Sequence, residues 1–222
     1  MSSSLSNADH HWHADEPKSL GNAAIRELRL TLLSATHIAR LTAFVEDLRS
    51  RRGVADHIPH FDPLDGGTLA ECLFLLEAPG PQAITSGFIS RNNPDETAKN
   101  FFTFNQNAGL DRRRTVVWNV VPWYVGTGKK IRPVSSEDIR DAEPALRSLL
   151  PLLPNLKIVV LVGQKAARAE TLLRQLNPTL RIMQIPHPSP LFVNRFPENK
   201  DRLKTAFKEV AAVINGAAGV VP

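Results

Sequence analysis

Two continuous apolar stretches in the middle of the chain predict strands that are buried on both faces. Residues 72–76 form an unbroken apolar run that stops at a Pro-Gly turn, and residues 115–121 contain a second run of this kind. Such runs are typical of a parallel sheet, because helices cover both of its faces. Two further strands are predicted at residues 157–162 and 180–185.

Apolar residues at helical spacing flank these strands. Residues 23–49 place Leu41, Phe44, Val45 and Leu48 at such a spacing, which predicts one or two helices. Further helices are predicted at residues 95–107, 136–150, 164–176 and 198–214. The order is one helix followed by four strand–helix alternations. This order predicts an α/β fold in which a parallel sheet lies between helical layers, with right-handed crossovers.

The composition agrees with one ordinary domain. The chain has 222 residues, of which 42% are hydrophobic and 22% are charged, and this argues against disorder. A formal charge of +5 favours polyanionic partners. The single cysteine, Cys72, excludes an internal disulfide framework and a cysteine-ligated iron–sulfur cluster. No apolar run is long enough for a membrane helix, and the N-terminus has no apolar signal core. A cytoplasmic protein without a membrane partner is therefore expected.

The first 20 residues are polar, and their composition predicts a mobile tail. His10, His11 and His13 form a short cluster in this tail that has the side chains to bind a metal, although the composition favours a solvated segment. Residues 21–222 are predicted to form a single domain.

Several widespread catalytic motifs are missing from the sequence. The chain has no G-x-x-x-x-G-K-[ST] phosphate loop, no G-x-G-x-x-G after a strand, no G-x-S-x-G elbow and no zinc-deaminase signature. Phosphate-loop, dinucleotide-binding and serine-hydrolase functions are therefore disfavoured.

Distinctive polar and turn residues instead follow the predicted strands. These are Glu77-Ala78-Pro79-Gly80 after the first strand, Asn119 in the second, and His187-Pro188-Ser189-Pro190-Leu191 after the fourth. Each segment alone is compatible with an ordinary turn. Ligands of parallel sheets bind at the carboxyl ends of the strands, so the joint placement predicts a site at this edge.

These segments resemble motifs of the uracil-DNA glycosylase superfamily. The first resembles the GEAPG element of its iron–sulfur and related bacterial branches, with Leu76 in place of the leading Gly, and the second matches the HPSPL motif of the best-known branch. The segments 118–121 and 160–166 resemble the ends of the family's second and third strands. The resemblance covers roughly residues 70–212. It implies a three-layer α/β/α sandwich with a central four-stranded parallel sheet.

The resemblance also implies roles in a pocket for a flipped base. Asn119 would read the base, since an amide matches uracil O4 and N3–H together. Phe88 would stack on the base, and His187 would stabilise the negative charge on the departing uracil. The segment from Glu77 to Gly80 would line the pocket, with Glu77 beside it. A satisfied strand-end amide at Asn119 and an ordinary core position for Phe88 remain open alternatives.

The HPSPL segment would contact the DNA itself. Pro188 and Pro190 would stiffen the loop, and Ser189 would donate a hydrogen bond to a phosphate. Leu191 would enter the duplex as an apolar wedge. Without the resemblance, Leu191 would be an ordinary buried leucine.

A glycine-rich basic loop follows the second strand. Its Lys129, Lys130 and Arg132 are predicted to contact phosphates, and a solvated surface loop is the alternative. The loop lacks the His of a branch that traps its substrate covalently. The run Arg112–Arg114 before the second strand is predicted to be a solvated turn, with a phosphate site as the less favoured alternative.

The sequence departs from the family pattern at three small residues. Ala78 stands where the best-known branch has a general-base Asp, so water would be held by backbone groups or by Asn119. Gly80 and Ala83 stand where other branches carry a Tyr or a carboxylate that excludes thymine. These changes predict that the protein excises a wider range of bases, which includes 5-substituted uracils and deaminated purines.

The sequence thus predicts a monofunctional, monomeric DNA glycosylase that flips out and hydrolyses uracil from DNA without a metal or other cofactor. It would be nucleoid-associated in a bacterium. One alternative is a non-catalytic nucleic-acid-binding protein that retains the fold, which the loss of Asp at position 78 favours. Another is a nucleotide-processing enzyme of a different α/β family, against which Leu191 and the basic loop argue.

Overall fold

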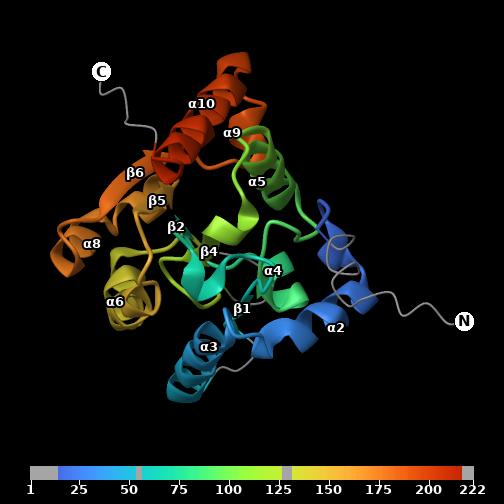
Figure 1. Cartoon of the computed structure of the whole chain (residues 1–222), viewed down its shortest axis with the longest axis vertical. Coiled ribbons are helices and arrows are strands. Elements are labelled where there is room, and N and C mark those ends of the chain that lie inside the picture. Colours follow the sequence, from blue (N-terminus) through green and yellow to red (C-terminus); the bar gives the residue numbers. More distant parts are fainter. Residues whose placement is uncertain (1–14, 54–56, 127–131, 217–222) are drawn as a thin grey trace, which may run out of the picture.

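The computed structural model describes residues 15–53, 57–126 and 132–216, and a parallel sheet lies at its centre (Figure 1). The strands are β2 (Cys72–Leu76), β4 (Thr115–Asn119), β5 (Ile158–Val162) and β6 (Arg181–Ile185). They lie in the order β4-β2-β5-β6, and each neighbouring pair is parallel. The sequence prediction of an α/β fold with a four-stranded parallel sheet is therefore confirmed.

Helices connect and cover these strands. They are α2 (Ala23–Thr31), α3 (Ala39–Arg52), α4 (Pro81–Ser86), α5 (Glu96–Asn107), α6 (Ser136–Leu149), α7 (Gln164–Ala167), α8 (Glu170–Leu176), α9 (Pro190–Val193) and α10 (Pro197–Ile214). The predicted segments 23–49 and 164–176 each hold two helices, and α4 and α9 were not predicted. No helix in the described ranges is both long and apolar enough to cross a membrane.

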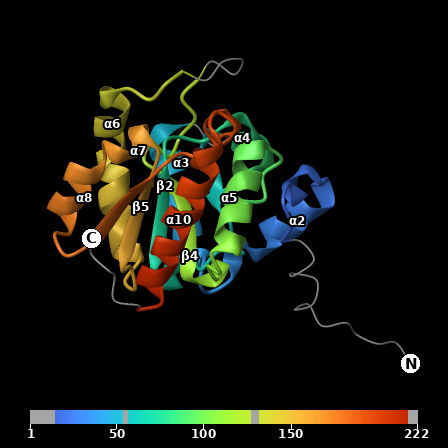
Figure 2. The same ribbon diagram turned by 90° about the horizontal axis from the view of Figure 1, so that it is seen from above.

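Aromatic side chains join the layers on the two faces of the sheet. On one face, Phe74 of β2 packs against Phe101 of α5 and Phe207 of α10, with ring centroids 5.0 and 5.8 Å away. On the other, Trp118 of β4 meets Phe44 of α3 at 6.3 Å. Figure 2 shows α5 and α10 together on one side of the strands. The molecule is thus a three-layer α/β/α sandwich.

A second, very small sheet lies outside the central one. Its strands are β1 (His60–Phe61) and β3 (Phe88–Ile89), which pair in parallel. Strands of two residues are too short to show a hydrophobic period, so the sequence did not reveal them. This pairing places the segment after α4 against the chain that leads into β2.

The N-terminal segment differs from its prediction. Residues 15–20 were assigned to a mobile tail, but Leu20 is fully buried and its N–H donates to the carbonyl of Asn92 at 3.1 Å. Asp15 accepts a hydrogen bond from the Asn92 side chain at 3.0 Å. The packed part of the chain therefore starts earlier than residue 21. Residues 1–14, with the three histidines, lie outside the described residues.

Candidate active site

A cavity of about 360 Å³ opens at the carboxyl ends of β2 and β4. Register places Leu76, the last residue of β2, beside Asn119, the last residue of β4. The predicted pocket residues that line this cavity are Ala78, Pro79, Gly80, Asn119 and His187. The structure therefore brings together segments that are far apart in the sequence.

Asn119 carries an unused hydrogen-bond donor in this cavity. The residue is 3% exposed, and its Nδ2 atom has no hydrogen-bond partner among the described residues. A buried polar atom without a partner costs about 1–3 kcal/mol, so such atoms are rare in folded proteins. A bound ligand with an acceptor at this point would remove that cost.

His187 lies at the boundary between the cavity and a neighbouring groove. Burial lowers the pKa of His187, and the nearby carboxylates of Glu77 and Asp95 oppose this shift. The ring is therefore neutral at pH 7 and presents one N–H donor. Gly163, which has φ of 88°, packs against it, because a Cβ at this position would lie 3.0 Å from His187 Cβ.

Glu77 lines the neighbouring groove and is not among the residues that line the cavity. Its Oε1 accepts a hydrogen bond from the backbone N–H of Val134 at 2.9 Å. The carboxylate thus holds the segment ahead of α6 and faces the same groove as His187. Glu77 therefore lies beside the cavity and not in its lining.

Two of the residues that line the cavity are small. A Cβ built on Gly80 would meet no atom within 4 Å, and its φ of −84° suits any residue. Ala83, one turn into α4, lines the cavity with only a methyl group. Position 80 therefore has space for a larger side chain, and position 83 contributes only a methyl group to the lining.

Phe88 does not take the position expected from the resemblance. Its side chain is fully buried in β3, where its ring lies 6.3 Å from the His60 ring, and it does not line the cavity. Successive residues of a strand point to opposite sides, and the next residue, Ile89, lines the cavity instead. The expected stacking contact of Phe88 is thus wrong for this structure, and the core alternative holds.

The HPSPL segment forms a rigid projection beside the cavity. Ser189 is the N-cap of α9, and its hydroxyl accepts a hydrogen bond from the N–H of Phe192 at 3.3 Å. The carbonyl of Pro188 accepts a hydrogen bond from the side chain of Asn100 at 3.0 Å. Pro190 starts α9, and Leu191 follows it with 82% of its surface exposed. The alternative of a buried leucine is therefore wrong.

The predicted basic residues have different environments. Lys129 and Lys130 lie outside the described residues. Arg132 forms two hydrogen bonds with the carboxylate of Asp138, at 2.6 and 2.7 Å. Its charge is therefore already partly compensated within the protein.

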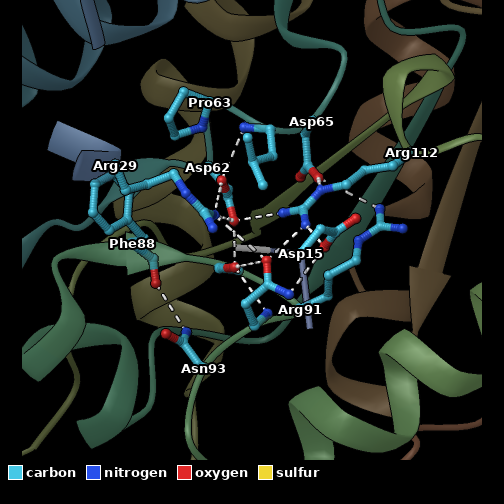
Figure 3. Close-up of polar contacts among 12 residues, drawn as sticks. Asp15, Arg29, Asp62, Pro63, Asp65, Phe88, Arg91, Asn93 and Arg112 are labelled. Atoms are coloured by element: carbon cyan, nitrogen blue, oxygen red, sulfur yellow. Dashed lines mark hydrogen bonds and ion pairs between the residues drawn. The ribbon is translucent and has the colours of Figure 1, made fainter. Parts of the chain in front are cut away.

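The run Arg112–Arg114 is not the solvated turn that was expected. Arg112 is buried, and its guanidinium bonds to Asp62 at 2.5 Å, to Asp65 at 2.7 Å and to Asp15 (Figure 3). Arg29 bonds to the same carboxylate of Asp62 at 2.6 Å. Burial raises the pKa of Asp62, but the charges of Arg112 and Arg29 outweigh it and hold the pKa well below its usual range. The sequence carried no signal for this network, because its members are far apart along the chain.

This ion network contacts the segment that forms one wall of the cavity. Asn92 is fully buried, and its amide bonds to Asp15 at 3.0 Å and to Arg112 at 2.6 Å. The residues on either side, Arg91 and Asn93, line the cavity. Hydrogen bonds therefore link the N-terminal segment to the wall of the cavity.

Fold and site together define an α/β protein with a ligand cavity at the carboxyl edge of a parallel sheet. The sequence model of the uracil DNA glycosylase superfamily matches residues 65–211, well over half of the chain, so the chain belongs to this superfamily. This membership supports a function of the uracil-DNA glycosylase type, and the family acts on DNA. None of the curated proteins compared with the chain matches it significantly.

The solved structures that are similar to the chain include the following two. The wild-type SMUG2 of Pedobacter heparinus has 12% sequence identity and a TM-score of 0.54, over 82% of this chain and 86% of that chain. A candidate uracil DNA glycosylase from Methanosarcina acetivorans has 17% identity and a TM-score of 0.44, over 64% of this chain and 92% of that chain. At 12% sequence identity, the similarity to SMUG2 shows a shared fold and nothing more.

Proposed function

We propose that the protein is a monomeric, monofunctional DNA glycosylase that excises uracil and leaves an abasic site. The observation that carries the proposal is the unpartnered Nδ2 donor of Asn119 in the same cavity as His187. The Asn119 amide would donate to uracil O4 and accept from N3–H, which requires a base that has left the stack.

His187 would stabilise the charge that develops when the base leaves. The bond between C1′ and N1 breaks with both electrons going to N1, so uracil departs as an anion and the sugar becomes oxocarbenium-like. A neutral His187 ring would donate its N–H to the base O2, where part of this negative charge accumulates. Such a preorganised donor lowers the activation free energy by about 3–4 kcal/mol.

Water then completes the reaction by attacking C1′, and the proton that it loses passes to the departing uracil anion, directly or through solvent. Ala78 has no carboxylate to accept that proton, so water would be held by backbone carbonyls around residues 77–80 or by Asn119. No lysine occurs among the described residues that line the cavity. An amine nucleophile is therefore not supplied there, which supports simple hydrolysis over lyase chemistry.

The substrate range would extend beyond uracil. Gly80 and Ala83 leave room for a group at C5 of the pyrimidine or for a larger deaminated purine. Leu191 would fill the gap in the duplex, Ser189 would contact a phosphate, and the basic loop with Lys129, Lys130 and Arg132 would contact the backbone. Arg132 would then exchange Asp138 for a phosphate.

The proposal is tested by single-turnover excision of uracil from DNA. His187→Ala should lower the chemical rate by about 10²–10³-fold with little change in DNA affinity. Asn119→Asp should weaken uracil excision, because a carboxylate replaces the amide donor that would face O4. Parental rates in either variant would contradict the assigned role.

The competing function is a DNA-binding protein without catalytic activity. The methyl side chain of Ala78, where a general base stands in the best-known branch, is the observation that favours it. A parent protein that binds uracil-containing DNA but releases no base at high enzyme concentration would support this function instead.

A further inference from the structure

Two exposed apolar side chains lie close together in the segment that links β6 to α10. Among the described residues, the large hydrophobic side chains with high exposure are Leu30, Leu69, Leu191 and Phe196. Leu191 is 82% exposed and Phe196 is 49% exposed. Leu30 belongs to α2 and Leu69 precedes β2, so they lie on other parts of the molecule.

The segment that presents Leu191 and Phe196 is held rigidly. Asn199, 3% exposed in the first turn of α10, donates from its side chain to the carbonyl of Phe192 at 2.8 Å. The backbone N–H of Asn199 also donates to the carbonyl of Phe196 at 3.1 Å. These bonds join the short helix α9 to the start of α10. The backbone that carries the two exposed side chains is therefore held in place by these bonds.

Phe196 lies at the same edge of the sheet as the cavity. The last carbonyls of α10 face the opposite edge, because Arg114, which precedes β4, donates to the carbonyl of Ile214 at 2.6 Å. The first residues of α10 must then lie at the carboxyl edge, next to α9. Figure 2 shows this arrangement, with α9 above the start of α10.

The chemistry around Phe196 fits a nucleic acid better than a protein surface. The guanidinium carbon of Arg195 lies 5.2 Å from the centre of the Phe196 ring, and Arg202 lies 5.9 Å from the ring of Phe192. An exposed aromatic ring beside cations offers a stacking face for a base together with charges for phosphates. Phenylalanine is also among the side chains that enter DNA between base steps.

We propose that Phe196 is a second duplex-contacting wedge, which unstacks a base step beside the one that Leu191 enters. Arg195, which lies against the Phe196 ring in the free protein, contacts the adjacent phosphate. This inference rests on the proposed function, since it assigns a DNA contact to the same site. It predicts that Phe196 is needed for duplex DNA and not for single strands, whose bases are already accessible.

The test compares one uracil-containing strand alone and in a duplex, under single-turnover conditions. Phe196→Ala should slow excision from the duplex by about 10-fold or more and change the single-strand rate less than about threefold, in line with the loss of one stacked base. Phe196→Trp should keep most of the duplex activity because it retains a planar ring. Leu69→Ala is the matched control, since it removes an exposed leucine away from this edge.

A second measurement reads the contact without turnover. A duplex with 2-aminopurine one base step beyond the step that Leu191 enters should brighten when the parent protein binds, because unstacking relieves quenching, and Phe196→Ala should lose this increase. Equal losses on both substrates, or an unchanged duplex rate with unchanged fluorescence, would overturn the wedge role. A parent that brightens the probe but releases no base would contradict the proposed glycosylase function and leave Phe196 as a DNA contact.

Discussion

Single residues decide what this site can accept. Asn119 offers an amide whose donor has no partner in the described structure, and His187 offers a neutral ring at the boundary of the cavity. Three small residues, Ala78, Gly80 and Ala83, line the same cavity. In the proposed function, the polar residues would read one edge of a base, whereas the small residues would set how large that base can be.

Gly80 is the residue at which the size limit can be changed. Gly80→Tyr should fit, because a Cβ there meets no atom within 4 Å and the backbone φ is −84°. Its ring should occupy the space for a C5 substituent and lower excision of 5-hydroxymethyluracil relative to uracil by about 10-fold or more. A pocket with spare room rejects such a group by only about 1–3 kcal/mol. The measurement is the ratio of the two excision rates in parent and variant, and an unchanged ratio would show that another residue guards C5.

The two edges of the central sheet differ in what they carry. The carboxyl edge carries the cavity, whereas charged residues at the amino edge hold the strands together. Glu71 precedes β2 and binds Arg114 before β4 at 2.7 Å and Lys157 before β5. One carboxylate thus links the starts of three neighbouring strands.

Glu71 makes the stability of this edge depend on pH. Hydrogen bonds from Arg114 and Lys157 lower the pKa of Glu71 from 4.5 to about 2. A group with a lowered folded-state pKa stabilises the protein above its unfolded pKa, and this contribution is lost as the pH falls toward the folded value. Glu71→Gln should therefore lower the midpoint of thermal unfolding at pH 7, and the difference from the parent should shrink between pH 4.5 and 2.

The matched control for this measurement is Glu143→Gln. Glu143 forms an exposed pair with Arg147 within α6, and exposed pairs of this type contribute little. A constant difference between Glu71→Gln and the parent across the acid range would contradict the electrostatic role of Glu71.

At the scale of the whole molecule, a buried ion network connects the N-terminal segment to the cavity wall (Figure 3). Arg112 forms ion pairs with Asp15, Asp62 and Asp65. It also donates a hydrogen bond to Asn92, whose neighbours in the chain line the cavity. The match to the family covers residues 65–211. Part of the support for the site therefore comes from chain that lies before the matched region.

Removal of Arg112 should destabilise the whole domain. Arg112→Met leaves the buried carboxylates of Asp62 and Asp65 without their main partner, which should cost about 3–5 kcal/mol in the free energy of unfolding. Urea denaturation measures this difference. Arg147→Met, which removes a half-exposed arginine from a pair on α6, should cost less than about 1 kcal/mol. Similar small losses in both variants would show that the network contributes little to stability.

The sequence by itself determined the sheet and the edge at which the site lies. Continuous apolar runs report burial on both faces, and parallel strands bring their carboxyl ends together wherever they lie in the chain. Asn119 and His187 therefore fell in one cavity with Ala78, Pro79 and Gly80, as expected from their positions after the strands.

Only the tertiary structure decided how individual side chains are used. Phe88 turned into the core because β3 pairs with β1, a strand too short for any sequence pattern to reveal. Arg112 became buried because its carboxylate partners lie 47, 50 and 97 residues away along the chain. A local pattern reports the period and the chemistry of neighbouring residues. Partners at such distances are chosen by the packing of the whole chain, which no local pattern contains.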